Sequence, residues 1–231
     1  MERRAADRRP ARDFRKALLE KPPAVISEIK RASPSKGVFT QSFRPVEIAK
    51  TYESGGAAAL SVLTDEEFFG GSWQDFDAAR AAVALPVLRK DFTIDAFHVI
   101  EAAAHAADAI LLIAAILTTA QMRLFREFAA EHGMASLVEV HNEEELLSAL
   151  DSGAEIVGVN NRNLHTFEVS LETALRLVEK IPANVVKVAE SGIHSNMDVL
   201  KLRAAGFNAF LVGEHLMKSP DPAAALKALR S

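Results

Sequence analysis

The chain has 231 residues, of which 49% are hydrophobic, 25% charged and 6% aromatic. This length and composition indicate a globular protein with one large core, and they exclude a disordered chain, a collagen-like repeat and a disulfide-stapled miniprotein. The absence of cysteine excludes disulfides, thiolate nucleophiles and zinc-cysteine sites, and the net charge of -4 gives no sign of a nucleic-acid or anionic-membrane partner.

The chain begins with a basic segment. Residues 1–16 hold seven Arg or Lys against three Asp or Glu, a balance of +4 that leaves -8 for the remainder. The segment has neither the composition of a transit peptide nor an apolar stretch for secretion, and the longest apolar runs are too short to span a bilayer. We therefore predict a solvated, partly helical extension over residues 1–23, a catalytic domain over residues 24–231 and a cytoplasmic location.

Eight short apolar runs, rich in β-branched residues, predict eight strands. These lie at residues 25–30, 58–63, 87–90, 109–113, 136–140, 156–160, 185–190 and 209–212. Alanine-rich amphipathic segments between and after them predict helices at residues 45–54, 73–83, 95–106, 119–131, 142–150, 171–180, 195–205 and 222–229. Unbroken alternation of this kind indicates parallel strands joined by crossover helices.

Residues at the ends of several predicted helices support the alternation. Pro45 suits a first helical turn, and Gly55 lies where that helix must end. Ser195 and Asp198 resemble a capping box, and Gly206 closes the same segment. Eight units in 231 residues give about 29 residues per unit, close to a barrel of roughly 250 residues. We therefore predict an α/β fold, a single-domain (β/α)8 TIM barrel with a short N-terminal extension.

A doubly wound open sheet has the same alternation of strands and helices. Its dinucleotide-binding members have a glycine-rich turn after the first strand. Residues 31–37 follow the first predicted strand here and contain no G-x-G-x-x-G, and the chain has no P-loop. The barrel is therefore favoured.

Charged and amide residues stand at the predicted carboxyl ends of five strands, where barrels place catalytic groups. Glu28 and Lys30 are two residues apart, so they project from one face of the first strand. Glu139 lies between two valines and is expected to have a raised pKa, whereas Lys90 among carboxylates is expected to stay charged. Such a set predicts acid–base catalysis. The histidines form no H-x-H or H-E-x-x-H pattern, so we expect neither a metal nor a cofactor.

The loops after the last two strands suggest phosphate binding. Barrels commonly bind a phosphoryl group at this place. Ser191-Gly192 and Gly213-Glu214 let backbone N–H groups approach an anion. We expect Ser33, together with the basic residues beside it, to complete the phosphate site.

Seven segments together resemble the indole-3-glycerol-phosphate synthase family. They are EIKRASPSKG (28–37), LTDEEFFGGS (63–72), RKDF (89–92), LVEV (137–140), VNNRNL (159–164), AESGI (189–193) and LVGE (211–214). They occur in order and at the family's spacing across roughly residues 13–230. The resemblance implies conversion of 1-(2-carboxyphenylamino)-1-deoxyribulose 5-phosphate to indole-3-glycerol phosphate, with loss of carbon dioxide and water.

The resemblance also implies a set of catalytic residues: Lys90, Glu139, Lys30, Glu28, Asn160 and Glu190. Lys90 would be the general acid for ring closure, Lys30 would hold the substrate carboxylate and act as an acid in dehydration, and Glu139 would be the partner acid or base. The other two glutamates would orient the lysines and stabilise cationic intermediates, and the asparagine would hydrogen-bond the reacting centre.

Binding residues follow from the same resemblance. Those implied for the substrate are Arg162 on the anionic side, Ser191 at a sugar hydroxyl, and Phe69, Phe92 and Leu164 near the anthranilate ring. Those implied for the phosphate are Ser33, Gly192, Gly213 and the N–H of Glu214. The expected partner is a small phosphosugar-anthranilate molecule, with no nucleic acid or membrane, and the simplest expected state is a monomer.

Two departures from the family pattern affect the mouth of the barrel. Family members have a longer N-terminal extension whose first helix covers the mouth, so a shortened lid is expected here. Glu214 stands where some relatives have serine, and its side chain is expected to point away and leave only its N–H for the phosphate.

Two alternatives remain open. One is another phosphosugar barrel, such as the isomerase of the same pathway, which would rely on a cysteine or an aspartate pair; the lack of cysteine counts against it. The other is a non-catalytic phosphosugar-binding barrel, which would not require Lys90 and Glu139 together.

Overall fold

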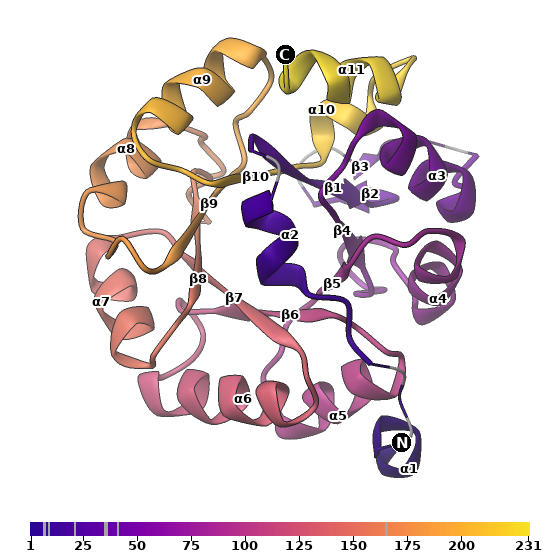
Figure 1. Ribbon diagram of the computed structural model, residues 1–231, viewed down its shortest axis with the longest axis vertical. Helices are drawn as coiled ribbons and strands as arrows, with labels where there is room; N and C mark the ends of the chain where they lie inside the picture. The colour runs from indigo at the N-terminus through magenta and orange to yellow at the C-terminus, as the bar shows by residue number, and fades with distance from the viewer. Residues whose placement is uncertain (7, 9, 21, 35–36, 41, 165) are drawn as a thin grey trace.

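Eight parallel strands close into a ring in the computed structural model, which describes residues 1–6, 8, 10–20, 22–34, 37–40, 42–164 and 166–231. The strands are β1 (Ala24–Ile29), β4 (Ala59–Leu63), β5 (Val87–Lys90), β6 (Ala109–Ile113), β7 (Ala135–Val140), β8 (Ile156–Asn160), β9 (Val186–Glu190) and β10 (Ala209–Val212). Each strand pairs with the next, and β1 pairs with β10 to complete the circle (Figure 1). The predicted (β/α)8 barrel is confirmed. Asp7, Arg9, Ser35 and Lys36, from the basic segment and the first motif, lie outside the described residues.

Helices form the outer ring of the barrel (Figure 1). They are α3 (Pro45–Gly55), α4 (Trp73–Ala82), α5 (Ala96–Ala104), α6 (Thr119–Glu131), α7 (Glu143–Asp151), α8 (Glu172–Val178), α9 (Asn196–Ala204) and α11 (Pro222–Leu229). The main core lies between the two rings, where outward-facing strand residues such as Val25 and Val62 join Tyr52 and Phe76 from the helices. Within the described ranges, no helix is long and apolar enough for a bilayer span.

The observed boundaries differ from the predicted ones by no more than two residues. β1 ends at Ile29, so Lys30 follows the strand. The Ser195 capping box is confirmed, whereas the left-handed residue that ends α3 is Gly56 and not Gly55. Three short elements were not predicted: the hairpin β2 (Ala32–Ser33) and β3 (Gly37–Val38), and α10 (Glu214–Met217). They are too short to show a hydrophobic period.

The barrel interior changes from apolar to charged along its axis. The four alternate strands β1, β5, β7 and β9 contribute Ile26, Leu88, Leu137 and Val188 to one buried cluster. Two residues further along the same strands stand Glu28, Lys90, Glu139 and Glu190. Side chains on a strand alternate between faces, and alternate barrel strands fill one interior layer, so these four residues form a layer above the aliphatic one.

The N-terminal extension closes the end of the barrel opposite to this charged layer. Its helices are α1 (Glu2–Ala6) and α2 (Phe14–Glu20), and Figure 1 shows α2 across the barrel centre. The side chains of Phe14 and Leu18 are buried in the interior cluster with residues at the starts of strands, such as Ala24 and Ala59. The described part of the extension is therefore a plug at the amino end and forms no lid over the mouth.

Arginine side chains attach the same segment to the loops that precede the strands. Arg8 donates to the carbonyl oxygen of Ala107 at 2.6 Å, and Arg12 donates to that of Leu85 at 2.6 Å. The backbone N–H of Arg12 donates to Asp108 at 2.8 Å. The prediction of a solvated leader is therefore wrong for Arg8 and Arg12, whose side chains pair with backbone carbonyls, whereas Arg3, Arg4 and Lys16 are exposed.

Candidate active site

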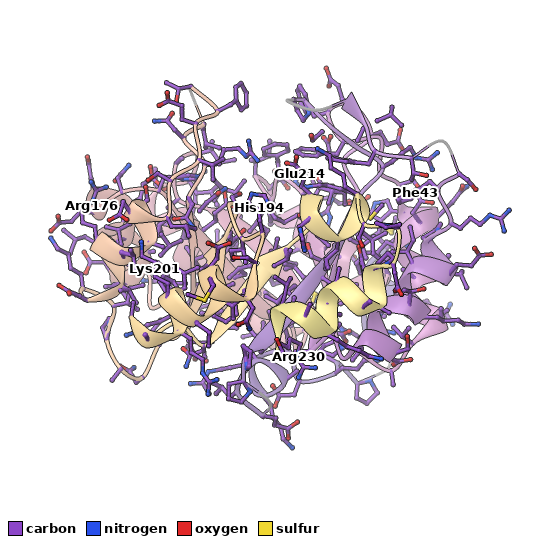
Figure 2. The ribbon with its side chains drawn as sticks, turned by 90° about the horizontal axis from the view of Figure 1, so that it is seen from above. Phe43, Arg176, His194, Lys201, Glu214 and Arg230 are labelled. Atoms are coloured by element: carbon purple, nitrogen blue, oxygen red, sulfur yellow. The ribbon has the colours of Figure 1, made fainter. Side chains whose placement is uncertain are left out.

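A cavity of about 410 Å³ lies at the carboxyl ends of the strands. Its lining includes every residue predicted for the site: Glu28, Lys30, Ser33, Phe69, Lys90, Phe92, Glu139, Asn160, Arg162, Leu164, Glu190, Ser191, Gly192, Gly213 and Glu214. Figure 2 shows Glu214 on the side where two loops rise above the barrel, whereas Arg230 lies toward the opposite side. Because the strands are parallel and close into a ring, segments that are far apart in the sequence meet at this end.

Two ammonium–carboxylate pairs lie at the floor of the cavity. Lys90 Nζ is 3.1 Å from Glu139 Oε2, and Lys30 Nζ is 2.5 Å from Glu28 Oε1. Asn160 Nδ2 donates to the other oxygen of Glu139 at 3.2 Å. Both carboxylates are buried, so pairing with a cation offsets much of the cost of removing them from water.

Lys90 and Glu139 fix each other in their charged forms. Burial alone would raise the pKa of Glu139, but the Lys90 ammonium and the His141 imidazole outweigh it and hold the pKa below the ordinary value. Burial alone would lower the pKa of Lys90, but Glu139 and the other nearby carboxylates raise it above the ordinary value. The prediction for Lys90 is confirmed. The prediction for Glu139 is wrong. The two valines are its neighbours along β7, whereas its pKa is set by the charged groups that approach its carboxylate.

Glu190 is the carboxyl group with the raised pKa. Burial, with the nearby Glu139 carboxylate adding to it, raises the pKa of Glu190 to about 8. Its Oε1 is buried and has no hydrogen-bond partner in the part of the chain that the structure describes. At neutral pH, Glu190 therefore holds a proton beside an ionised Glu139.

Two glycines make room for the carboxyl groups. A Cβ atom at Gly158 would overlap Glu190 Oε1, and one at Gly213 would overlap Glu28 Oε1. Gly213 was predicted as a phosphate contact, but Gly158 was missed. A glycine inside a strand often marks close approach of another group, and this signal was present in the sequence.

The loop after β9 has an unusual backbone conformation. Ser191 and Gly192 have consecutive φ angles of 63° and 78°, in the left-handed region that a serine seldom adopts. Across the cavity, Ser33 Oγ is buried and makes no hydrogen bond to any described residue. A phosphate oxygen would satisfy this hydroxyl group.

The Glu214 side chain does not leave the mouth. Its Oε1 is 2.6 Å from Lys218 Nζ, and its Oε2 is 3.9 Å from Arg162 Nη2. Glu214 pairs with Lys218 and lies near Arg162 in the loop after β8, and the expectation that only its N–H binds the phosphate stays a prediction. The carboxylate joins the two loops at the rim.

Apolar side chains surround the rim of the cavity. Phe92 and Leu164 are 37% and 44% exposed, which is unusual for residues that serve only as core packing. The ring of Phe92 meets that of Phe68 edge to face at a centroid distance of 6.2 Å.

The cavity lining also includes residues that were not predicted from the sequence, namely Asp65, Asp91, Ile116, Phe167, Val169, His194 and His215. Their position in the loops after strands was the available signal.

Over the described ranges, no group of three or more His, Asp or Glu side chains is arranged to hold a metal ion.

Known proteins resemble this chain over nearly its full length. A family model described as indole-3-glycerol phosphate synthase matches residues 1–229. The indole-3-glycerol phosphate synthase of Albidiferax ferrireducens is 54% identical over 222 residues, which cover 94% of this chain and 84% of that protein. The protein of the same name from Koribacter versatilis is 49% identical over 231 residues, which cover 99% of this chain and 88% of that protein.

Solved structures with lower identity share the fold. A 3-hexulose-6-phosphate synthase matches with a TM-score of 0.71 at 18% identity, covering 90% of this chain and 98% of that chain. The thiamine phosphate pyrophosphorylase of Pyrococcus furiosus matches with a TM-score of 0.66 at 21% identity, covering 94% and 96%. At these identities the likeness concerns the barrel alone.

Proposed function

The chain belongs to the indole-3-glycerol phosphate synthase family, and from this membership we propose that it converts 1-(2-carboxyphenylamino)-1-deoxyribulose 5-phosphate to indole-3-glycerol phosphate, carbon dioxide and water. It is then a carboxy-lyase of tryptophan biosynthesis. The observation that carries the proposal is the charged layer at the mouth, where the Lys90 ammonium and the Glu139 carboxylate stand 3.1 Å apart. A proton donor and a proton acceptor meet there in one cavity.

Ring closure requires a proton on the ketone oxygen of the substrate as the aromatic carbon attacks the carbonyl carbon. We assign this proton to Lys90, whose raised pKa keeps it protonated at neutral pH. Glu139 holds the Lys90 ammonium in place before the transfer. The geometry supports general acid catalysis from a side chain anchored on β5.

Decarboxylation and dehydration use the second cation. Lys30 binds the substrate carboxylate until it leaves as carbon dioxide, with its ammonium held by Glu28 at 2.5 Å. Lys30 then donates the proton that lets the hydroxyl group leave as water, and Glu139 accepts a proton as the indole ring forms. Glu190 is protonated at neutral pH and can ionise as positive charge develops on the intermediate, which would stabilise that charge.

The remaining predicted residues would hold the two ends of the substrate. We assign the phosphate to Ser33, Gly192, Gly213 and the N–H of Glu214, and the aromatic ring to Phe69, Phe92 and Leu164. We assign Arg162 to an anionic group of the substrate and Ser191 to a sugar hydroxyl. A cavity of about 410 Å³ is within the usual size range for small-molecule sites.

One chain supplies all of the proposed catalytic residues. We therefore propose that the protein acts as a monomer. A phosphorylated biosynthetic substrate also favours a cytoplasmic location. Sedimentation of the purified protein would test the oligomeric state.

Turnover by Lys90→Ala tests the proposed chemistry. Formation of the fluorescent indole product from the carboxyphenylamino-deoxyribulose phosphate should be easily detected for the unaltered protein. We expect kcat to fall by about 10² to 10⁴ in Lys90→Ala, the usual contribution of a general acid. Lys201→Ala is the matched control, because Lys201 pairs with Glu172 on the outer surface. No indole product from the unaltered protein would overturn the function, and unchanged turnover in Lys90→Ala would overturn the role of Lys90.

A further inference from the structure

The imidazole ring of His141 lies between two carboxylates. Its Nδ1 is 2.9 Å from Glu145 Oε2, which also accepts a hydrogen bond from the His141 backbone N–H at 2.8 Å. Its Nε2 is buried, makes no hydrogen bond to a described residue, and lies at an ion-pair distance of 3.4 Å from Glu139 Oε1. Because an ionised carboxylate can only accept hydrogen bonds, this arrangement suits a ring that carries a proton on both nitrogens.

His141 is placed behind the cavity. It follows the last residue of β7, its side chain is 11% exposed, and it is not part of the cavity lining among the described residues. Glu145 lies in the first turn of α7, where its Oε1 accepts from Asn142 Nδ2 at 2.6 Å and its N–H donates to Asn142 Oδ1 at 2.9 Å. Asn142, the N-cap of α7, therefore holds Glu145 in place by hydrogen bonds, and Glu145 in turn holds the imidazole ring.

Glu139 is held from both sides of its carboxylate. Lys90 approaches Oε2, whereas Asn160 and His141 approach Oε1. His141 is therefore the second cation against the group that the proposed reaction uses as its base.

Charged groups approach Glu139 from several elements. Lys90 is paired with its carboxylate, and the buried carboxyl groups of Glu28 and Glu190 lie near the same ammonium group. The groups that act on His141 itself are Glu139 from β7 and Glu145 from α7. Burial alone would lower the pKa of His141, but its contacts with these two carboxylates raise it to about 9. The ring therefore carries a positive charge at neutral pH.

We propose that His141, held by Glu145, is a positioning residue that keeps Glu139 ionised and aimed at Lys90 during catalysis. This inference rests on the proposed function. His141 is not among the described residues that line the cavity, so it acts through Glu139. Its loss should change how activity depends on pH more than it changes KM.

The pH dependence of kcat/KM tests the proposal. When His141→Gln removes the cation, the pKa of Glu139 rises, so more of Glu139 is protonated at acidic pH and the acidic limb moves to higher pH. We expect a shift of about one pH unit, the lower end of the effect of one nearby opposite charge. Glu145→Gln should shift the limb in the same direction by less, because the ring remains but loses one of its partners. KM should stay close to that of the unaltered protein.

His132→Gln is the matched control. His132 bonds to the carbonyl oxygen of Phe128 at 2.9 Å at the end of α6, away from the mouth. This variant should leave the acidic limb in place. An unchanged limb in His141→Gln, or a change in KM alone, would overturn the proposal.

An NMR titration of the imidazole groups in the ligand-free protein gives a readout that does not depend on activity. His141 should lose its proton near pH 9, and at a lower pH in Glu145→Gln. If the protein forms no indole product, the proposed function fails, while the titration still tests the contact between His141 and Glu139. Titration of His141 at or below the ordinary value of about 6.5 would overturn the inference.

Discussion

The two ends of the barrel differ in the kinds of side chain that they bury. At the amino end, the side chains of Phe14 and Leu18 fill the interior, and Arg12 satisfies backbone carbonyl oxygens. At the mouth, Glu190 Oε1 and Ser33 Oγ are buried without hydrogen-bond partners among the described residues. The amino end therefore buries apolar side chains and pairs Arg12 with backbone carbonyls, whereas the mouth buries ionisable groups and leaves the oxygens of Glu190 and Ser33 available.

This difference teaches where stability and function reside in the fold. Burial of apolar side chains stabilises the folded state, whereas burial of ionisable groups stabilises it only when their partners are well placed. The raised pKa of Glu190 is itself a sign of an unfavourable environment for a carboxylate. We therefore expect substitutions at the amino end to change the free energy of unfolding, and substitutions at the mouth to change kcat.

The largest expected effect on stability comes from Phe14→Ala. The phenyl ring is 1% exposed in the interior cluster, so its removal leaves a cavity and should lower the free energy of unfolding by about 3 to 5 kcal/mol. Denaturant unfolding would measure the loss, with Phe97→Ala, at a half-exposed ring, as the control. At a temperature where the variant is folded, kcat should be unchanged. A large fall in kcat would mean that α2 also shapes the mouth and would break the comparison.

Gly158→Ala should lower kcat, in contrast to Phe14→Ala, which should lower stability. The added methyl group would displace the Glu190 carboxyl group, and misplacement of a catalytic group by about 1 Å can lower kcat about 10²-fold. Gly153→Ala is the matched control, because Gly153 has a φ of 86° in the turn before β8 and its substitution strains the backbone outside the mouth. The control should lose stability and keep kcat. Equal kcat values for the two variants would argue against a role for Glu190.

The smallest expected effect is on the pH dependence of stability in Glu190→Gln. The pKa of Glu190 is about 8 in the folded protein and about 4.3 in an unfolded chain, so the folded state binds more protons between these values. Its contribution to stability is therefore present below about pH 4.3 and is lost as the pH rises to about 8. Thermal unfolding from pH 5 to pH 8 should show a smaller decline for Glu190→Gln than for the unaltered protein. The same decline in both proteins would contradict the raised pKa.

Local sequence was enough to predict that the charged residues at the strand ends would meet at the mouth, whereas Phe69, Phe92 and Leu164 were implied only by the family resemblance. Four charged residues each stand two positions after an apolar residue of the same strand, which predicts that they face the interior: Glu28, Lys90, Glu139 and Glu190. Parallel strands present their carboxyl ends at one edge, so all of the predicted residues line one cavity. The sequence could not show which groups Gly158 and His141 contact, because Glu190 and Glu139 become their neighbours only when β7, β8 and β9 pair.

The sequence by itself determined the alternation of strands and helices, the inward face of each strand and the set of groups at the mouth. Only the tertiary structure decided where the basic extension packs, which carboxyl group has the raised pKa, and where the side chain of Glu214 lies. The physical reason is distance along the chain. Periodicity within a segment determines which way a side chain faces, whereas its charge state depends on groups such as Lys90 and Glu139, which are 49 residues apart and meet only when the barrel closes.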